Sequence, residues 1–126
     1  MKFYKCNVCG QVLGTIEDTG VNPTCCNEPM ELLEAKVEEP ELGEKHIPVY
    51  KLCKGKLVTK IGSVAHPATN EHHIEWILVV TDKGLHKKDL KPTETPEATF
   101  CLEKGETVKE IYAFCNLHSL WKKEVK

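Results

Sequence analysis

Hydrophobic and β-branched residues after residue 44 gather in short runs, and no stretch there shows the 3.6-residue period of an amphipathic helix. These runs cover residues 49–52, 56–61, 73–81, 85–90, 98–102 and 108–115. Turn-forming residues separate them at 54–55, 82–84 and 104–105. The regular spacing predicts an antiparallel β-sandwich rather than parallel strands connected by helices.

The run at 73–81 is the most apolar. Alternation places Ile74, Trp76, Leu78 and Val80 on one face of the expected strand, and further apolar side chains lie on the other face. A strand that is apolar on both faces is typical of the middle of a sheet. We therefore expect this strand to be central.

The first 36 residues follow a different pattern, with dense turn signals and four cysteines. A segment this short cannot build a sufficient hydrophobic core, so a bound metal is the expected source of its stability. Residues 37–43 are acidic, contain Pro and Gly, and are predicted to be a linker. The sequence thus predicts a metal-stapled domain over 1–36 and a β domain over 44–126.

Composition excludes several classes of function. The chain has 126 residues, of which 40% are hydrophobic and 29% charged, and its formal net charge is −2. This balance favours a globular protein without a global field for nucleic acid, so nucleic acid is not an expected partner. No apolar stretch is long enough for a signal peptide or a membrane span. We expect a cytoplasmic protein with no membrane partner.

Seven cysteines are many for a cytoplasmic chain, where disulfides are rare, so metal binding is the leading explanation. Cys6 and Cys9 have knuckle spacing, with Gly10 allowing a tight turn. Cys25 and Cys26 are adjacent, so they can share one metal only if the backbone bends sharply between them, which would distort a tetrahedron. From the residues alone, zinc, iron and a disulfide framework stay open for these four.

A second group of candidate ligands lies in the β domain. Cys115 and His118 are three residues apart, so one turn can bring both to a metal. His46, His66 and His72 each lie near the end of a predicted strand, where sites are commonly built, although each alone is typical of a surface histidine. The remaining histidines and cysteines are predicted to have structural roles: His73 and His86 as ordinary polar residues, and Cys53 and Cys101 as small buried ones.

Six ordered motifs now make a resemblance specific. They are residues 4–10, 25–30, 44–49, 62–67, 72–77 and 115–121. With them the whole chain resembles the desulfoferrodoxins, the two-iron class of superoxide reductases. One-iron members of that family lack the N-terminal cysteines, so the presence of all four here implies the two-iron class.

The resemblance implies a mainly β protein, with a desulforedoxin-like knuckle followed by an immunoglobulin-like antiparallel sandwich, and a homodimer. It implies two non-haem iron ions per chain. One is held by the tetrathiolate Cys6, Cys9, Cys25 and Cys26, where zinc is a competing occupant on overexpression. The other is the catalytic iron, with equatorial ligands His46, His66, His72 and His118 and the axial thiolate Cys115. Glu44 matches a carboxylate that occupies the open coordination position in the oxidised enzyme, and Lys45 matches a nearby cation.

The implied activity is one-electron reduction of superoxide to hydrogen peroxide in antioxidant defence. Rubredoxin or a similar protein is the expected electron donor, and the tetrathiolate iron is a candidate relay. Two other interpretations compete with this one. The first is a non-enzymatic zinc knuckle fused to an immunoglobulin-like interaction domain, and the second is a rubredoxin-like electron carrier whose only redox centre is the tetrathiolate.

Overall fold

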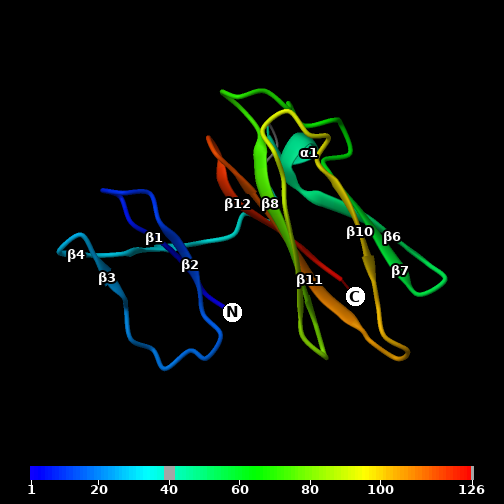
Figure 1. Cartoon of the computed structure of the whole chain (residues 1–126), viewed down its shortest axis with the longest axis horizontal. Helices are drawn as coiled ribbons and strands as arrows, with labels where there is room; N and C mark the ends of the chain where they lie inside the picture. The colour runs from blue at the N-terminus through cyan, green and yellow to red at the C-terminus, as the bar shows by residue number, and fades with distance from the viewer. Residues whose placement is uncertain (39–41, 126) are drawn as a thin grey trace. The chain divides into compact units, whose positions relative to one another are not determined.

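The computed structural model describes residues 1–38 and 42–125. The chain forms two compact units, Met1–Glu34 and Ala35–Lys126 (Figure 1). The domain bounds predicted from the sequence remain predictions, because residues 39–41 of the expected 37–43 linker lie outside the described residues.

The first unit is a small β structure with little apolar core. Its strands are β1 (Phe3–Lys5), β2 (Val12–Gly14), β3 (Thr24–Cys25), β4 (Glu28–Pro29) and β5 (Glu31–Leu33). They form a three-stranded sheet in the order β2-β1-β5 and a separate β3-β4 pair. The buried cluster comprises only Tyr4, Cys6 and Met30, with Cys25 packed against it. Since two of these four residues are cysteines, a metal held by them would be part of the core.

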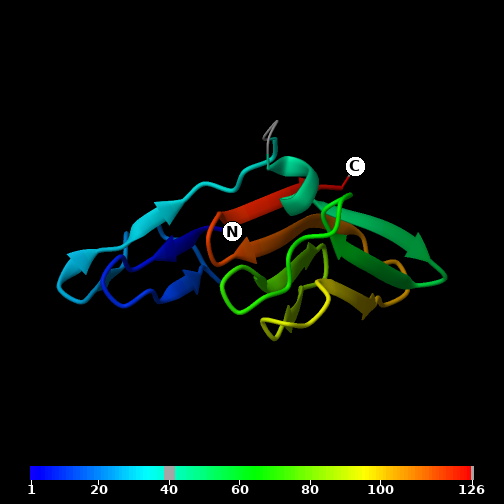
Figure 2. The same cartoon turned by 90° about the horizontal axis from the view of Figure 1, so that it is seen from above.

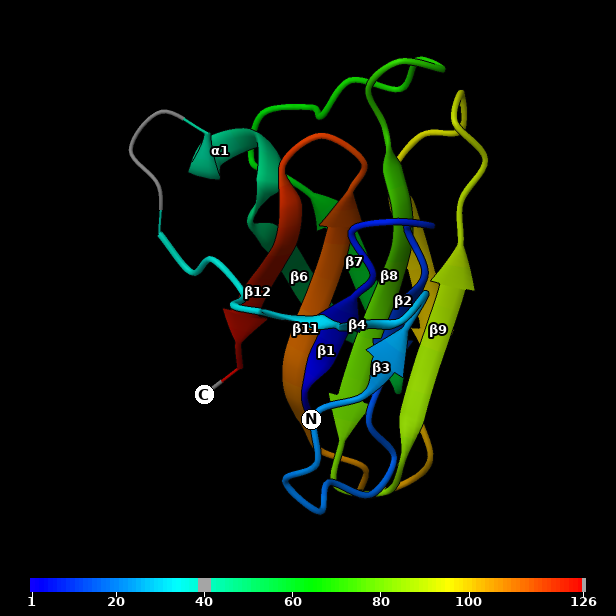
Figure 3. The same ribbon diagram turned by 90° about the vertical axis from the view of Figure 1, so that its left-hand side faces the viewer.

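The second unit is a sandwich of two antiparallel sheets, as the alternating pattern predicts (Figures 1 and 3). One sheet has the order β10-β7-β6 and the other β12-β11-β8-β9. The strands are β6 (Pro48–Cys53), β7 (Lys56–Ile61), β8 (Ile74–Thr81), β9 (Leu85–Asp89), β10 (Glu97–Cys101), β11 (Val108–Cys115) and β12 (Ser119–Glu124). The predicted fold class is confirmed.

The core lies between these two sheets. Leu57 and Phe100 contribute from one sheet, and Ile77 and Ile111 contribute from the other. Alternation along the strands explains how this core forms. It is clearest in β7, where every second residue is buried. Burying one such aliphatic or aromatic side chain contributes about 1.5–3 kcal/mol relative to leaving it in water. The alternation therefore fixes which face of each strand points inward.

β8 lies between β11 and β9, which confirms that it is central. However, the expectation that Ile74 and Trp76 lie on the same face of this strand is wrong. The register with β11 shifts so that Ile74 pairs with Cys115 whereas Trp76 pairs with Phe114. This bulge at Glu75 places Ile74 in the same buried core as Ile77, because the extra residue breaks the two-residue alternation.

Two elements of the second unit are absent from the sequence-based expectation. β12 carries three charged residues in six, and Lys122 on it makes ion pairs with Glu110 and Glu124. The single-turn helix α1 (Gly43–His46) has no side-chain cap and is too short to show a helical period. Figure 2 looks onto the end of the sandwich where α1 lies. No helix in residues 1–38 or 42–125 has the length and apolarity to span a membrane.

The prediction that Cys53 and Cys101 are buried is wrong, since both are exposed. Both pair with Lys56, Cys53 from β6 and Cys101 from β10. Residues in register across a sheet share one face, and Lys56 is on the outward face of β7. The alternation that buries Leu57 therefore turns both thiols outward.

Candidate metal centres

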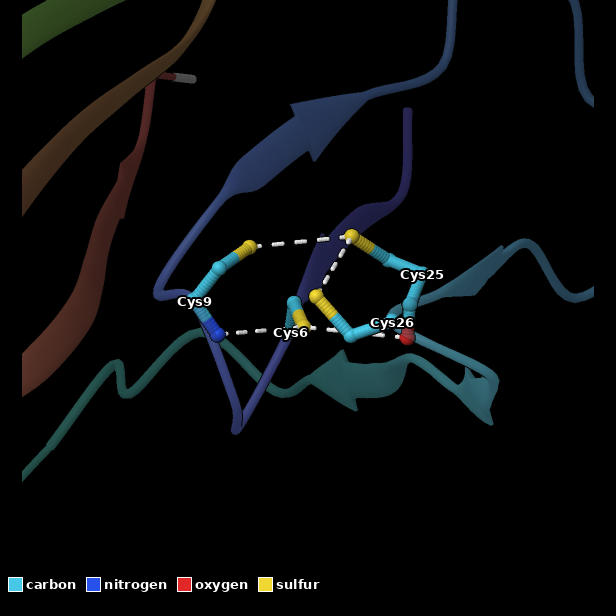
Figure 4. Close-up of side chains that lie close together, drawn as sticks. All are labelled: Cys6, Cys9, Cys25 and Cys26. Atoms are coloured by element: carbon cyan, nitrogen blue, oxygen red, sulfur yellow. Dashed lines mark hydrogen bonds between the residues drawn. The ribbon is translucent and has the colours of Figure 1, made fainter.

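The four cysteines of the first unit converge on one point (Figure 4). The Cys9 sulfur lies 3.6 Å from that of Cys25, which in turn lies 3.9 Å from that of Cys26. All four sulfurs are within 4.8 Å of one another. A tetrahedral ion with bonds of about 2.3 Å to thiolates requires sulfurs about 3.8 Å apart, so the cluster fits a tetrathiolate metal.

Local backbone geometry explains how the pairs come together. Gly10 has a φ of 83°, and its N–H donates to the Cys6 carbonyl at 2.9 Å, which closes the knuckle. The adjacent pair is followed by a sharp turn, since Cys26 and Asn27 have φ values of 53° and 61°. Non-glycine residues seldom adopt positive φ values, so two in succession mark a specific tight turn at this position. The expected bend at Cys25 and Cys26 is therefore present.

The thiols of this cluster do not ionise alike. Backbone N–H groups of Cys9 and Val8 lower the pKa of Cys6 to about 6. The Cys6 side chain, which stays close to Cys25, raises the pKa of Cys25 to about 12. Negative charge thus collects first on one sulfur and opposes ionisation of the next. A cation is what allows all four to be thiolates together.

The second cluster lies at one end of the sandwich and draws on segments far apart in the sequence. His46 ends α1, His66 and His72 lie in the loop between β7 and β8, Cys115 ends β11, and His118 lies in the β11–β12 turn. These segments share the upper end of the second unit in Figure 3. The ligand atoms of His46, His66, His72 and Cys115 all lie within 4.8 Å of one another.

His118 completes this cluster. Its Nδ1 lies 3.2 Å from His46 Nε2 and 3.8 Å from the Cys115 sulfur. The His118 ring also meets the ring of His72, with centroids 5.0 Å apart. The structure thus brings together the four histidines and the cysteine that the sequence singled out.

Hydrogen bonds fix which ring nitrogens carry lone pairs. His46 Nδ1 lies 2.8 Å from the Leu42 carbonyl, and His66 Nδ1 lies 2.7 Å from that of Pro67. A carbonyl only accepts, so each Nδ1 must carry the proton, and each Nε2 of the neutral ring then has a lone pair. These two Nε2 atoms face each other at 3.1 Å. Two lone pairs at that distance repel unless a cation lies between the rings and accepts both.

Burial favours the neutral form of three of these histidines, which is the form that binds a metal. It lowers the pKa of His46 and His72, and it lowers the pKa of His66 to about 4. Nε2 of His72 is buried and has no hydrogen-bond partner among the described residues. An unpaired buried nitrogen is costly, and a metal bond would remove that cost. The donor set therefore fits a metal ion.

Cys115 is set up as the soft ligand of this centre. Burial raises the pKa of its thiol, while the backbone N–H groups of His118 and Leu117 donate to the sulfur and favour the thiolate. A buried thiolate gains strongly from a neighbouring cation. Four neutral imidazoles and one hydrogen-bonded thiolate are a set suited to a borderline transition metal such as iron.

Comparison with known proteins matches this geometry. The family model described as "Desulfoferrodoxin" matches residues 38–124, and "Desulfoferrodoxin, N-terminal domain" matches residues 1–33. This chain belongs to the desulfoferrodoxin family. The desulfoferrodoxin of Nitratidesulfovibrio vulgaris is 43% identical over 124 residues, covering 98% of this chain and 95% of its own. A desulfoferrodoxin homolog of Archaeoglobus fulgidus is 40% identical over 121 residues, with 96% and 94% covered.

A solved structure extends the likeness to three dimensions. The superoxide reductase from Treponema pallidum superposes with a TM-score of 0.81 at 34% identity, covering 98% of this chain and 96% of that one. The one-iron superoxide reductase from Giardia intestinalis has a TM-score of 0.58 at 31% identity, covering 66% of this chain and 98% of that one. The shorter relative thus accounts for only part of this family member.

Glu44 and Lys45 lie on α1 immediately before His46, and both are exposed. Lys45 is close enough for its charge to lower the pKa of His72, after larger contributions from burial, His118 and His73. The loop after β7 holds α1 in place, because Val64 N–H donates to the Glu44 carbonyl at 2.9 Å. The position of both residues next to His46 is thus fixed by the backbone, and the Lys45 charge lies near His72.

Position 62 in that loop requires a glycine, because the loop backbone lies directly against the backbone of α1 and the residue after it. Its N–H donates to the Ile47 carbonyl, and its φ is 84°. A Cβ there would meet the Lys45 carbonyl oxygen at 2.7 Å, which no real side chain tolerates. Glycine is thus required where the loop that carries His66 crosses α1.

Sequence reasoning missed two residues that support the ligands. The Asn116 side chain accepts from His73 N–H and donates to the Glu71 carbonyl, both at 2.9 Å, which ties the His72 loop to the turn after Cys115. Trp121 is fully buried and stacks on His46. Both lie inside the recognised motifs, but nothing in a residue type reveals such support until the partners are known. The ordinary polar roles predicted for His73 and His86 agree with their contacts, since His73 Nδ1 lies 2.9 Å from the Thr69 carbonyl and His86 pairs with Glu106 at 2.8 Å.

Proposed function

We infer that this protein is a superoxide reductase that reduces superoxide to hydrogen peroxide at the second centre, with one electron and two protons consumed per superoxide. The observation that carries this inference is the facing lone pairs of His46 and His66, 3.1 Å apart beside the Cys115 thiol. Its relatives by sequence and by structure include proteins named superoxide reductase. A cation held there by four nitrogens and one sulfur is the expected occupant.

Iron is the metal we assign to both centres, two ions per chain. The tetrathiolate is formed by Cys6, Cys9, Cys25 and Cys26, and the catalytic ligands are His46, His66, His72, His118 and Cys115. Soft thiolates accept iron as well as zinc, so zinc is expected to compete at the tetrathiolate on overexpression. Ferrous iron, when bound at the histidine–cysteine centre, supplies the electron that superoxide takes up.

The histidines act as neutral, oriented donors. Carbonyls of Leu42 and Pro67 hold the rings of His46 and His66 with Nε2 directed to the centre. Because four neutral ligands add no charge, only the Cys115 thiolate reduces the positive charge that attracts an anion. The N–H groups of Leu117 and His118 draw density from this sulfur and so restrain its donation.

Lys45 and Glu44 act at the rim in this proposal. Superoxide is an anion and the chain carries a net charge of −2, so attraction must come from local positive potential. The exposed ammonium of Lys45 supplies it beside His72. By family resemblance the Glu44 carboxylate would be a further ligand of the oxidised iron. Both side chains are reached by water, which is the source of the two protons.

The remaining assignments rest on family resemblance. We propose that the tetrathiolate iron relays electrons, that rubredoxin or a similar carrier is the donor, and that the chain works as a cytoplasmic homodimer in detoxification of superoxide. A reductant is needed in any case, because each turnover leaves the catalytic iron one electron short. Each of these assignments can fail without changing the chemistry of the second centre.

Metal analysis combined with one pair of variants tests the proposal. Protein from its native host should contain two irons per chain, and the prereduced protein should consume superoxide rapidly. Cys115→Ser should abolish that reaction even where iron remains, because a hydroxyl is a weak ligand for ferrous iron. Cys53→Ser is the matched control, since that thiol is exposed and ends β6, the strand that starts beside α1 and runs away from it. One zinc and no iron, or an active Cys115→Ser, would contradict the assignment.

A further inference from the structure

Trp121 contacts two of the proposed ligands at once. Its ring stacks on that of His46 with centroids 4.6 Å apart and planes inclined by 22°. Its Nε1–H donates to the His118 carbonyl at 3.0 Å. The indole is fully buried, so neither contact competes with water. A group that packs on the opposite face of the indole therefore lies only one ring away from His46.

That other side is covered by Lys36. The Lys36 ammonium lies over the indole, 5.1 Å from the ring centroid. Since His46 occupies one face of the ring, the ammonium occupies the opposite face. Lys36 is an exposed residue whose backbone is tied to β12, because it forms a parallel bridge with Trp121. The Lys36 N–H donates to the Leu120 carbonyl at 3.0 Å, and the Lys36 carbonyl accepts from Lys122 at 2.9 Å.

The Lys36 charge lies close to the ligands. The two centroid distances place the ammonium at most about 10 Å from the His46 ring centroid. Burial dominates the pKa values of His46 and Cys115, and Lys36 adds a Coulombic contribution at both. Its field thus reaches a nitrogen ligand and the sulfur ligand. The ammonium of Lys36 is on an exposed residue, but the buried indole excludes water from the space between it and the His46 ring, which weakens screening there.

We propose that Lys36, held over Trp121, is a positioning residue that sets the reduction potential of the metal bound by His46 and Cys115. The inference rests on the proposed function only in requiring a redox-active metal at that centre. A nearby positive charge favours the state with less positive charge, which is the ferrous state. Lys36 therefore keeps the catalytic iron reducible by a donor, from a segment that follows directly on the tetrathiolate unit in the chain.

The test is a spectroelectrochemical titration of the iron-replete chain, following the visible absorption of the ferric histidine–cysteine centre. In Lys36→Gln the ratio of ferrous to ferric iron at a fixed potential should fall by about two- to sixteenfold, as a unit charge at about 10 Å implies for an effective dielectric constant between 80 and 20. Lys36→Arg keeps the charge and should restore the ratio. Lys56→Gln is the matched control, because Lys56 lies at the far end of β7, about 20 Å along the strands from α1.

Two results would overturn the inference. An unchanged midpoint potential in an iron-replete Lys36→Gln would show that the charge has no effect on the centre. An equal shift in Lys56→Gln would show that only net charge matters. Absence of iron from the histidine–cysteine centre in the unmodified chain would be a different failure, since it would remove the proposed function and this inference with it.

Discussion

Asn116→Ala gives the sharpest test of how the catalytic ligands are held. The Asn116 side chain accepts from His73 N–H and donates to the Glu71 carbonyl, and these two residues flank His72. Each hydrogen bond contributes about 0.5–1.5 kcal/mol net. Water replaces the exposed bond to Glu71 more readily than the partly buried one to His73. The expected total loss is therefore about 1–2 kcal/mol.

This loss should appear in metal binding rather than in the chemistry of the bound ion. Without Asn116 the His72 loop is less ordered before metal binds, so ordering it costs free energy on binding. A cost of about 1–2 kcal/mol weakens the affinity about 5- to 30-fold, which overlaps the lower part of the roughly 10- to 100-fold range typical of residues that support metal ligands. Anaerobic competition of ferrous iron between the protein and a chromophoric chelator measures this change.

Asn22→Ala is the control for this experiment. Asn22 donates to the Pro23 and Met30 carbonyls at 3.1 Å each, so its loss also removes two side-chain hydrogen bonds, but in the first unit. It should leave the affinity of the histidine–cysteine centre unchanged. A folded Asn116→Ala with the same affinity as the unmodified chain would refute the reasoning, and so would an equal weakening in Asn22→Ala.

Three further predictions concern other residues. Lys45→Ala should slow the reaction with superoxide roughly tenfold, or about 1.4 kcal/mol, and make the rate less dependent on salt. Pulse radiolysis over a salt series measures the rate and its salt dependence, and an unchanged slope would make Lys45 a simple surface charge. Cys25→Ser should lose the tetrathiolate iron, and the prereduced variant should still reduce superoxide rapidly. Iron analysis and stopped-flow kinetics measure these two properties. A variant that keeps iron at the second centre but cannot reduce superoxide would show that the two centres are not independent. Hydrogen bonds from Thr81, a backbone N–H and His86 lower the pKa of Glu106 to about 2, below its ordinary value of 4.5. The ionised Glu106 carboxylate therefore stabilises the folded protein fully above pH 4.5, and this stabilisation is lost as the pH falls towards 2. Glu106→Gln should abolish this part of the pH dependence, and urea unfolding midpoints that are equally acid-sensitive in both proteins would contradict the prediction.

Local pattern predicted most of the fold. The bounds expected for β7 and β11 match those observed, because alternate residues of these strands face a core formed by both sheets. β12 was missed because its buried Leu120 and Trp121 are adjacent and charged residues follow them, so no alternation is visible. Its pairing with β11 depends on partners that the local sequence does not reveal.

The candidate site was predictable only in part from its own residues. Cysteine spacing pointed to the tetrathiolate, and the turn at Cys26 supplies the bend that adjacent ligands need. His46 and His118 are 72 residues apart, and their approach depends on how loops of two sheets meet at one end. Family resemblance supplied that grouping in advance. The support from Trp121 and Lys36 emerged only from the structure, since a ring contact leaves no signal in sequence spacing.

The balance of products per superoxide tests the central claim most directly. Anaerobically prereduced protein is mixed with a known amount of superoxide, and hydrogen peroxide and dioxygen are both measured. Reduction at the histidine–cysteine centre predicts one hydrogen peroxide for each superoxide consumed and no dioxygen released. Release of one dioxygen for every two superoxide ions, or no reaction in protein with iron at both centres, would contradict the account.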